Sequence, residues 1–93
     1  MAAKRFKMRL SSVGNPDFGQ YAPLSPARVV RADTLKEMRA ACEAYIEEFD
    51  LGGGNWIEPI VYDGDLVVGK FSYNRRLWKG LGRGIESREE ILL

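Results

Sequence analysis

The sequence predicts an α+β fold, a two-layer sandwich in which one amphipathic helix packs on a four-stranded, mostly antiparallel sheet. Three observations predict it. Residues 4–10 alternate apolar and basic side chains, residues 34–51 place apolar side chains at helical spacing after a capping box, and residues 56–74 contain two strand-like runs around a tight turn. The expected element order is β-β-α-β-β.

The first strand is expected in residues 4–10. Phe6, Met8 and Leu10 point to one side of an extended chain and Arg5, Lys7 and Arg9 to the other, a period of two that is typical of a half-buried strand. A turn-rich connection, residues 11–27, then leads to a second strand in residues 28–32 with β-branched residues at its centre. Loops of this length inside small domains are usually functional or mobile.

The helix has the clearest local signal in the chain. Thr34 and Glu37 form a capping box, in which each residue's side chain accepts a hydrogen bond from the other's backbone N–H. Apolar residues at helical spacing follow on one face: Leu35, Met38, Cys42, Tyr45, Ile46 and Phe49. We expect this helix to continue to about Leu51 and to end at Gly52, acting as the C′ glycine.

Two further strands are expected after a glycine-rich connection, residues 52–55. The first covers residues 56–62, with Trp56 packing in the core and Pro59 at a strand start or edge. Residues 63–65 form a hairpin turn, and the last strand covers residues 66–74, with Val67, Phe71 and Tyr73 on one face. Residues 1–79 therefore form a single α+β domain, and residues 80–93 a weakly ordered C-terminal tail.

The composition disfavours most catalytic chemistry. The 93 residues include no histidine and one cysteine, Cys42. This excludes the usual tetrahedral zinc sites, Ser–His and Cys–His nucleophile pairs and an internal disulfide. Cys42 is expected to be a small core residue. We therefore expect no enzymatic activity, no metal and no cofactor. No apolar run is long enough to span a bilayer and no signal peptide is recognisable, so the chain is expected in the cytoplasm without a membrane partner.

The charge is segregated along the chain although its net value is +1. Residues 1–31 carry six basic and one acidic side chain, residues 32–65 two basic and nine acidic, and residues 66–93 six basic and three acidic. Four acidic side chains lie on the helix and at its end, and three of them, Glu47, Glu48 and Asp50, oppose the helix dipole. These acidic residues form either a solvated helix face or an acidic docking surface for a nucleic-acid-binding protein. The complete acidic set is Glu43, Glu47, Glu48 and Asp50.

Basic and aromatic residues on the strands are the other candidate binding set. The expected single helix covers one face of the sheet, so the basic side chains of the first strand stand on an open face. The last strand interleaves aromatic and basic residues, a composition found in single-strand nucleic-acid sites and equally in a buried strand with a basic rim. The complete set is Arg5, Lys7, Arg9, Lys70, Arg75, Arg76 and Trp78.

Residues 28–79 also carry a family resemblance. The segment contains Leu51-Gly-Gly-Gly-Asn-Trp56 and Val68-Gly-Lys-Phe-Ser-Tyr-Asn-Arg-Arg-Leu-Trp78. It resembles small uncharacterised proteins of phages, plasmids and integrated elements whose terminal hairpin ends in a Ser-Tyr-Asn-x-Arg-x-Trp run. Arg75 stands where a glycine is often expected. The resemblance implies a protein that binds a host machine, as anti-CRISPR and anti-restriction proteins do.

Three hypotheses about function follow. The first is a non-enzymatic interaction protein of a phage or mobile element that inhibits a host defence complex, such as CRISPR–Cas or a restriction system, by surface occlusion. Its partner is a host protein or ribonucleoprotein complex. The alternative is a small nucleic-acid-binding accessory protein that uses the basic and aromatic sheet face. A third is a homodimer that covers this face, in place of a monomer.

Overall fold

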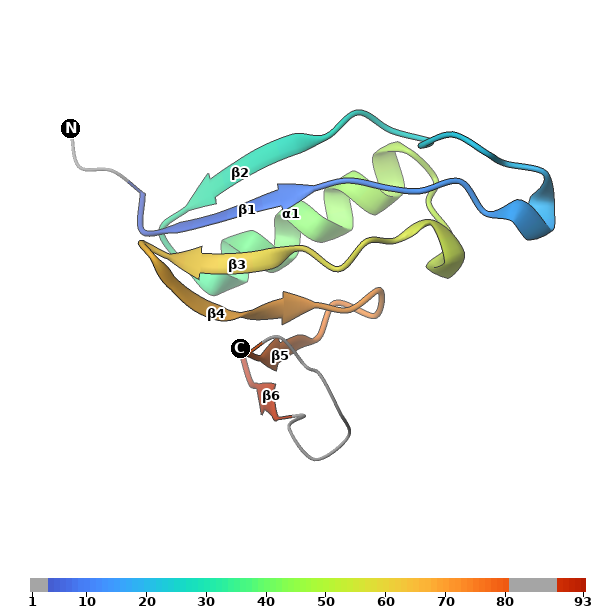
Figure 1. Ribbon diagram of the computed structural model, residues 1–93. Helices are drawn as coiled ribbons and strands as arrows, with labels where there is room; N and C mark the ends of the chain where they lie inside the picture. Colours follow the sequence, from blue (N-terminus) through green and yellow to red (C-terminus); the bar gives the residue numbers. More distant parts are fainter. Residues whose placement is uncertain (1–3, 81–88) are drawn as a thin grey trace.

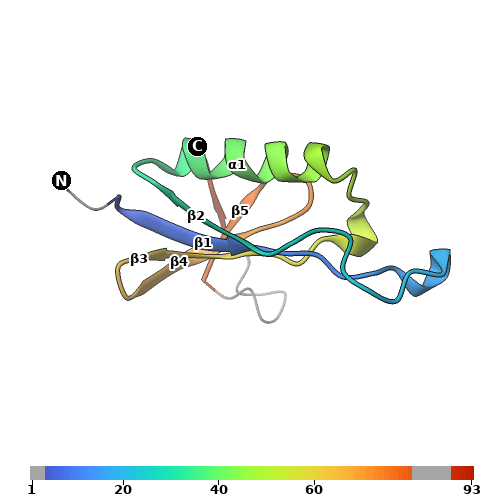
Figure 2. The same ribbon diagram turned by 90° about the horizontal axis from the view of Figure 1, so that it is seen from above.

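The computed structural model describes residues 4–80 and 89–93 and has one helix on one side of an antiparallel sheet (Figures 1 and 2). The predicted α+β class is confirmed. The elements are β1 (Phe6–Leu10), β2 (Arg28–Ala32), α1 (Leu35–Glu48), β3 (Ile60–Asp63), β4 (Leu66–Phe71), β5 (Leu77–Lys79) and β6 (Glu90–Ile91), with 3-10 turns η1 (Pro16–Phe18) and η2 (Gly53–Asn55).

The sheet has six strands, so the prediction of four is wrong. Their order is β2-β1-β3-β4-β5-β6, with every neighbouring pair antiparallel. The fifth strand exists because the chain turns back after β4: the Ser72 backbone N–H donates to the Arg76 carbonyl and the Arg75 N–H to the Ser72 carbonyl. Arg75 itself takes a left-handed conformation at φ 65°. The tight turn therefore forms without a glycine at that position.

The sixth strand comes from the segment predicted to be a weakly ordered tail. Residues 81–88 of that segment lie outside the described part of the chain. Beyond them Glu90–Ile91 pairs with β5, and the Lys79 N–H donates to the Glu89 carbonyl at 2.7 Å. Ile91 and Leu93 pack against the hydrophobic core.

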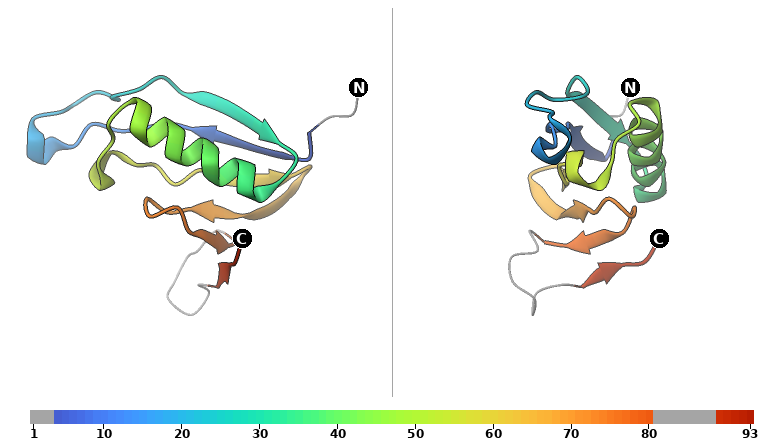
Figure 3. Two further views of the ribbon diagram at one scale, coloured as in Figure 1. Left: turned by 180° about the vertical axis from the view of Figure 1, so that it is seen from behind. Right: turned by 90° about the vertical axis from the view of Figure 1, so that its right-hand side faces the viewer.

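The core lies between α1 and the sheet (Figure 3). The alternation in β1 is confirmed: Phe6, Met8 and Leu10 are buried, and the residues between them are exposed. The helix contributes the predicted face, and the later strands complete the layer. The fully buried large side chains are Tyr45, Phe71, Met8, Leu10, Met38, Leu77, Val61 and Cys42.

The start of α1 is as predicted and its end is not. The Thr34 side chain accepts a hydrogen bond from the Glu37 N–H at 3.1 Å. The helix ends at Glu48, and Asp50, in place of Gly52, takes the left-handed conformation at φ 50°. The Leu51 N–H donates to the Ile46 carbonyl, which completes a Schellman motif at the end of α1. Leu51, the apolar residue that follows the left-handed Asp50, is buried. Burial of Leu51 therefore determines where the helix stops.

The third and fourth strands differ from the prediction at their ends. β3 begins at Ile60 in place of Trp56, because η2 and Pro59 interrupt the ladder before it. Trp56 is buried as predicted, and its indole N–H donates to the Phe71 carbonyl at 3.0 Å. The predicted hairpin turn between β3 and β4 is confirmed by the Asp63–Leu66 pair.

A β-bulge in β4 reverses the predicted direction of one side chain. Val61 pairs with Gly69 and Tyr62 with Val67, so Val68 is the extra residue. Val67 therefore shares the outer face of the sheet with Tyr62 and is 41% exposed, while Val68 packs against the core. The expectation that Val67 shares a face with Phe71 is wrong, since a bulge shifts the alternation by one residue.

Side-chain hydrogen bonds hold the connection of residues 11–27 at both of its ends. Ser25 Oγ lies 2.6 Å from Ser12 Oγ and 2.6 Å from the Tyr45 hydroxyl, which also donates to the Pro26 carbonyl. Asn55 donates from its amide to the Val13 carbonyl and to Gln20 Oε1. This connection projects past the end of the helix (Figure 2).

We predict that Gly69→Ala destabilises the fold by about 1–3 kcal/mol, a typical cost of overpacking. A Cβ at Gly69 would overlap the Trp78 carbonyl oxygen, so β5 would have to move away from β4. Gly53→Ala is the matched control, because a Cβ there meets the Tyr73 ring at an ordinary 3.7 Å. Urea unfolding measures both free energies. Equal losses in the two variants would contradict close β4–β5 packing as the cause.

Candidate binding surfaces

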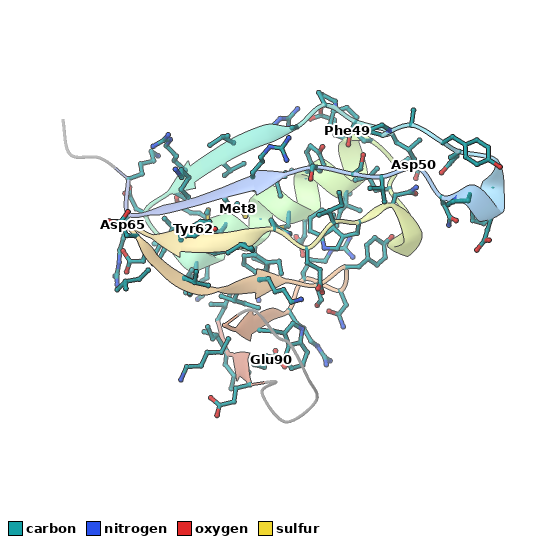
Figure 4. All side chains as sticks on the ribbon, in the orientation of Figure 1. Met8, Phe49, Asp50, Tyr62, Asp65 and Glu90 are labelled. Carbon is teal, nitrogen blue, oxygen red and sulfur yellow. The ribbon has the colours of Figure 1, made fainter. Side chains whose placement is uncertain are left out.

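One face of the sheet is not covered by α1, and we call it the open sheet face. Residues paired across neighbouring antiparallel strands point to the same side of a sheet. The pairs Lys7–Arg31, Arg9–Val29, Lys7–Tyr62, Tyr62–Val67 and Lys70–Trp78 therefore define this face. In Figure 4 this face is turned toward the viewer, with Tyr62 labelled on β3. The sequence analysis named four members of this face: Lys7, Arg9, Lys70 and Trp78.

Three cations gather at its β1–β2 end. Lys7, Arg9 and Arg31 are exposed, and none of the ion pairs found in residues 4–80 and 89–93 includes them. Together with Val29 and Tyr62 they surround a shallow hollow of about 220 Å³. Arg31 was missed by the sequence analysis, because only the pairing of β2 with β1 places it opposite Lys7.

Two other predicted cations are engaged in ion pairs. Arg5 Nε donates to Asp63 Oδ2 at 3.0 Å, and this hydrogen bond raises the pKa of the Arg5 guanidinium above its ordinary value. Lys70 Nζ lies 2.9 Å from Glu58 Oε1. These pairs neutralise part of the charge that the sequence assigned to the basic face.

Arg75, Arg76 and Trp78 do not act as one group. The Trp78 indole N–H donates to Ser72 Oγ at 3.2 Å, which holds the half-buried ring beside Lys70. Arg75 and Arg76 instead line a groove on the helix side. The structure therefore divides the predicted basic and aromatic set between two sides of the sheet.

The predicted acidic residues lie along the exposed side and the end of α1, but they are not equivalent. Glu48 Oε2 lies 2.8 Å from Arg28 Nη2, and that guanidinium also lies over the rings of Tyr45 and Phe49. Glu43 lines the same helix-side groove as Arg75 and Arg76. Glu47 and Asp50 are exposed near the end of the helix.

The tip of the 11–27 connection exposes large apolar side chains that the sequence analysis did not single out. Phe18 is 77% exposed and Tyr21 is 85% exposed. The tip is held by Asn15, whose side chain accepts from the Asp17 N–H and whose carbonyl accepts from the Phe18 and Gln20 N–H groups. Aromatic residues between the turn signals of this loop were the available sequence signal.

Cys42, the single cysteine of the chain, lies in the core as predicted. Cys42 is fully buried, and burial raises the pKa of its thiol to about 12, which leaves it protonated near neutral pH. Within residues 4–80 and 89–93 no three metal-ligating side chains of the His, Cys, Asp and Glu types come together. No helix in that same part of the chain is long and apolar enough to cross a bilayer.

Comparison with known proteins adds no relative: no family model matches the chain, and searches of curated proteins and of solved structures gave no match.

We predict that Glu48→Gln lowers the thermal midpoint by more at pH 7 than at pH 3. The hydrogen bond from Arg28 lowers the pKa of Glu48 in the folded state. A lowered folded-state pKa contributes stability above the unfolded value of about 4.3, and the contribution is lost as the pH falls through the folded pKa. The shift should be small and weakened by salt, since both side chains are exposed.

Glu47→Gln is the control for this prediction, because it removes a negative charge at the same end of α1 without breaking an ion pair found in the described residues. Calorimetry at both pH values measures the midpoints. An equal loss for Glu48→Gln at pH 7 and pH 3 would show that the ion pair is not the cause.

Proposed function

We propose that this chain is a non-enzymatic binding protein whose open sheet face holds a single strand of nucleic acid. The observation that carries the proposal is the cluster of Lys7, Arg9 and Arg31 around Tyr62, with no ion-pair partner in the described residues. Unpaired cations on one surface attract a polyanion and release its counterions on binding.

The spacing of these cations suits a chain of phosphates. Residues two apart on a strand lie about 7 Å from each other, and cross-strand neighbours lie about 5 Å apart. Lys7 and Arg9 are two apart on β1, and Arg31 is the cross-strand partner of Lys7. The three side chains can therefore contact neighbouring phosphates of one strand.

Aromatic side chains on the same face provide stacking surfaces. Tyr62 on β3 is next to the cation cluster, and Trp78 on β5 is next to Lys70. Both rings are half-buried, so part of each is accessible from this side. Bases stack on accessible aromatic rings without regard to sequence, which is how sheet-face platforms bind single strands. Among the described residues, neither a helix nor a ribbon projects from this face, so it is less suited to enter a groove of double-stranded DNA.

We predict that the double variant Arg9→Gln/Arg31→Gln weakens binding of a labelled oligo-dT strand of about 20 nucleotides by about tenfold or more. Two lost phosphate contacts lower the slope of log affinity against log salt by about 1.4. Fluorescence anisotropy over a salt series measures both quantities.

The matched control is Arg28→Gln/Lys79→Gln. It removes two charges from β2 and β5 that are already ion-paired with Glu48 and Glu89. Circular dichroism checks that both variants are folded. Equal weakening by both would contradict a specific role of the open sheet face. A stable homodimer that Arg9→Gln/Arg31→Gln dissociates in sedimentation equilibrium would also overturn the proposal, because it would assign this face to a second copy.

A second candidate function is inhibition of a host defence complex, of the CRISPR–Cas or restriction type, by surface occlusion. It is supported by Phe18 and Tyr21, which are highly exposed on a loop held in place by Asn15, Gln20 and Asn55. Exposed aromatic residues on a pre-organised loop are frequent hot spots in protein interfaces.

We predict that Phe18→Ser/Tyr21→Ser abolishes such inhibition while leaving oligo-dT affinity unchanged. The assay expresses the chain in cells that carry a CRISPR–Cas or restriction system and measures the transformation efficiency of a targeted plasmid. Inhibition by the unsubstituted chain that falls at least tenfold in the variant supports the candidate function. Two results count against it: both chains raise the transformation efficiency of the targeted plasmid equally, or the unsubstituted chain does not raise it.

A further inference from the structure

A second concentration of positive charge lies on the helix side of the sheet, away from the open sheet face. A groove of about 430 Å³ separates α1 from the turn that joins β4 to β5. The turn lies beside the helix when the molecule is seen from behind (Figure 3). The charged side chains that line the groove are Lys36, Arg39, Glu43, Arg75, Arg76 and Glu90.

We infer that this groove binds a phosphate group. Four cations and two carboxylates line it, an excess of two positive charges that matches a dianionic phosphate. None of the ion pairs found in the described residues involves any of the four cations. The four positive charges repel one another, because no carboxylate is close enough to form an ion pair with any of them among the described residues. A bound anion relieves that repulsion.

The helix wall of the groove presents its charges in one row. Lys36, Arg39 and Glu43 follow one another at spacings of three and four residues, which places them on one helix face. Ala40 lies between them and also lines the groove. Its small side chain leaves room for a ligand between the longer side chains. The row begins in the first turn of α1, where the helix dipole is positive and favours an anion.

The opposite wall is the β4–β5 turn, and its geometry holds Arg75 in place. The Arg75 Nη1 donates to the Tyr73 carbonyl at 3.1 Å, and the guanidinium lies 5.4 Å from the centre of the Tyr73 ring. The Tyr73 hydroxyl is in turn bonded to the Leu51 carbonyl. Arg75 keeps a left-handed backbone at φ 65°, a conformation in which glycine is less strained. Strain retained at a charged side chain is typical of binding positions.

Guanidinium groups are suited to this ligand. A planar guanidinium donates two parallel hydrogen bonds to the oxygens of one phosphate, and Arg39, Arg75 and Arg76 contribute three such groups from two walls. Two sources present this phosphate chemistry: a free nucleotide such as ADP, and the backbone of a nucleic-acid strand.

The test titrates ADP without metal, inorganic phosphate and an oligo-dT strand into the ¹⁵N-labelled protein and follows backbone amide shifts. We expect ADP to shift the amides of residues 36–43 and 74–76 and to bind at least tenfold more weakly to Arg39→Gln/Arg76→Gln. The control Arg9→Gln/Arg31→Gln, which alters the open sheet face, should bind ADP as the unsubstituted chain does.

The outcomes separate the sources and the two sites. Shifts of the groove amides by oligo-dT, competing with ADP, assign the groove to a nucleic-acid backbone, whereas shifts by ADP or phosphate alone assign it to a small phosphorylated molecule. Absence of groove shifts with all three probes, or ADP binding that Arg39→Gln/Arg76→Gln leaves unchanged, overturns the inference. A failure of the groove inference is distinguishable from a failure of the proposed function, because Arg39→Gln/Arg76→Gln reports on the groove and Arg9→Gln/Arg31→Gln reports on the open sheet face.

Discussion

One helix covers one face of this sheet, and the rest of the structure depends on that constraint. α1 has 14 residues and lies against one face of the six-stranded sheet (Figure 2). α1 can therefore bury the inner side chains of the strands and nothing on their other side. The core gathers on the inner side around Met8, Tyr45 and Phe71, whereas the outer side keeps Lys7, Arg9 and Arg31 exposed and Tyr62 and Trp78 half-buried.

Tyr45 and Asn55 connect this core to the long loop. Tyr45 is fully buried, yet its hydroxyl reaches Ser25 and the Pro26 carbonyl at the end of the loop. Asn55 is buried as well and bonds to the start of the loop through the Val13 carbonyl and to Gln20. A long connection is therefore anchored at points on the helix and on η2, and its exposed tip is carried on a defined base.

Ion pairs connect the segments of opposite charge along the chain. Arg5 pairs with Asp63, Arg28 with Glu48 and Lys70 with Glu58, so each pair links a basic terminal segment to the acidic middle segment. Seven of the described cations outside these pairs gather in two groups. One group, Lys7, Arg9 and Arg31, lies on the open sheet face, and the other lines the helix-side groove. The near-zero net charge conceals both.

Local patterns in the sequence were sufficient for the elements with strong periodicity. The burial of alternate residues in β1 follows from an extended strand with one side against a core: Phe6, Met8 and Leu10. The start of α1 follows from a contact within one helical turn, between Thr34 and Glu37. The class of the fold, the burial of Trp56 and Cys42 and the exposure of Lys7 and Arg9 follow from the same patterns.

Tertiary contacts decided the remaining features, because they depend on residues far apart in the chain. The helix stops at Glu48 since Leu51 is buried, and the bulge at Val68 follows from how β4 pairs with β3. Arg31 joins Lys7 only through the pairing of β2 with β1, and Arg75 meets Arg39 only where the β4–β5 turn folds beside α1. The sequence by itself determined where the first two strands and the helix lie, and which side of β1 and of α1 is apolar. The tertiary structure alone decided which cations share a surface, because charges cluster by proximity in space.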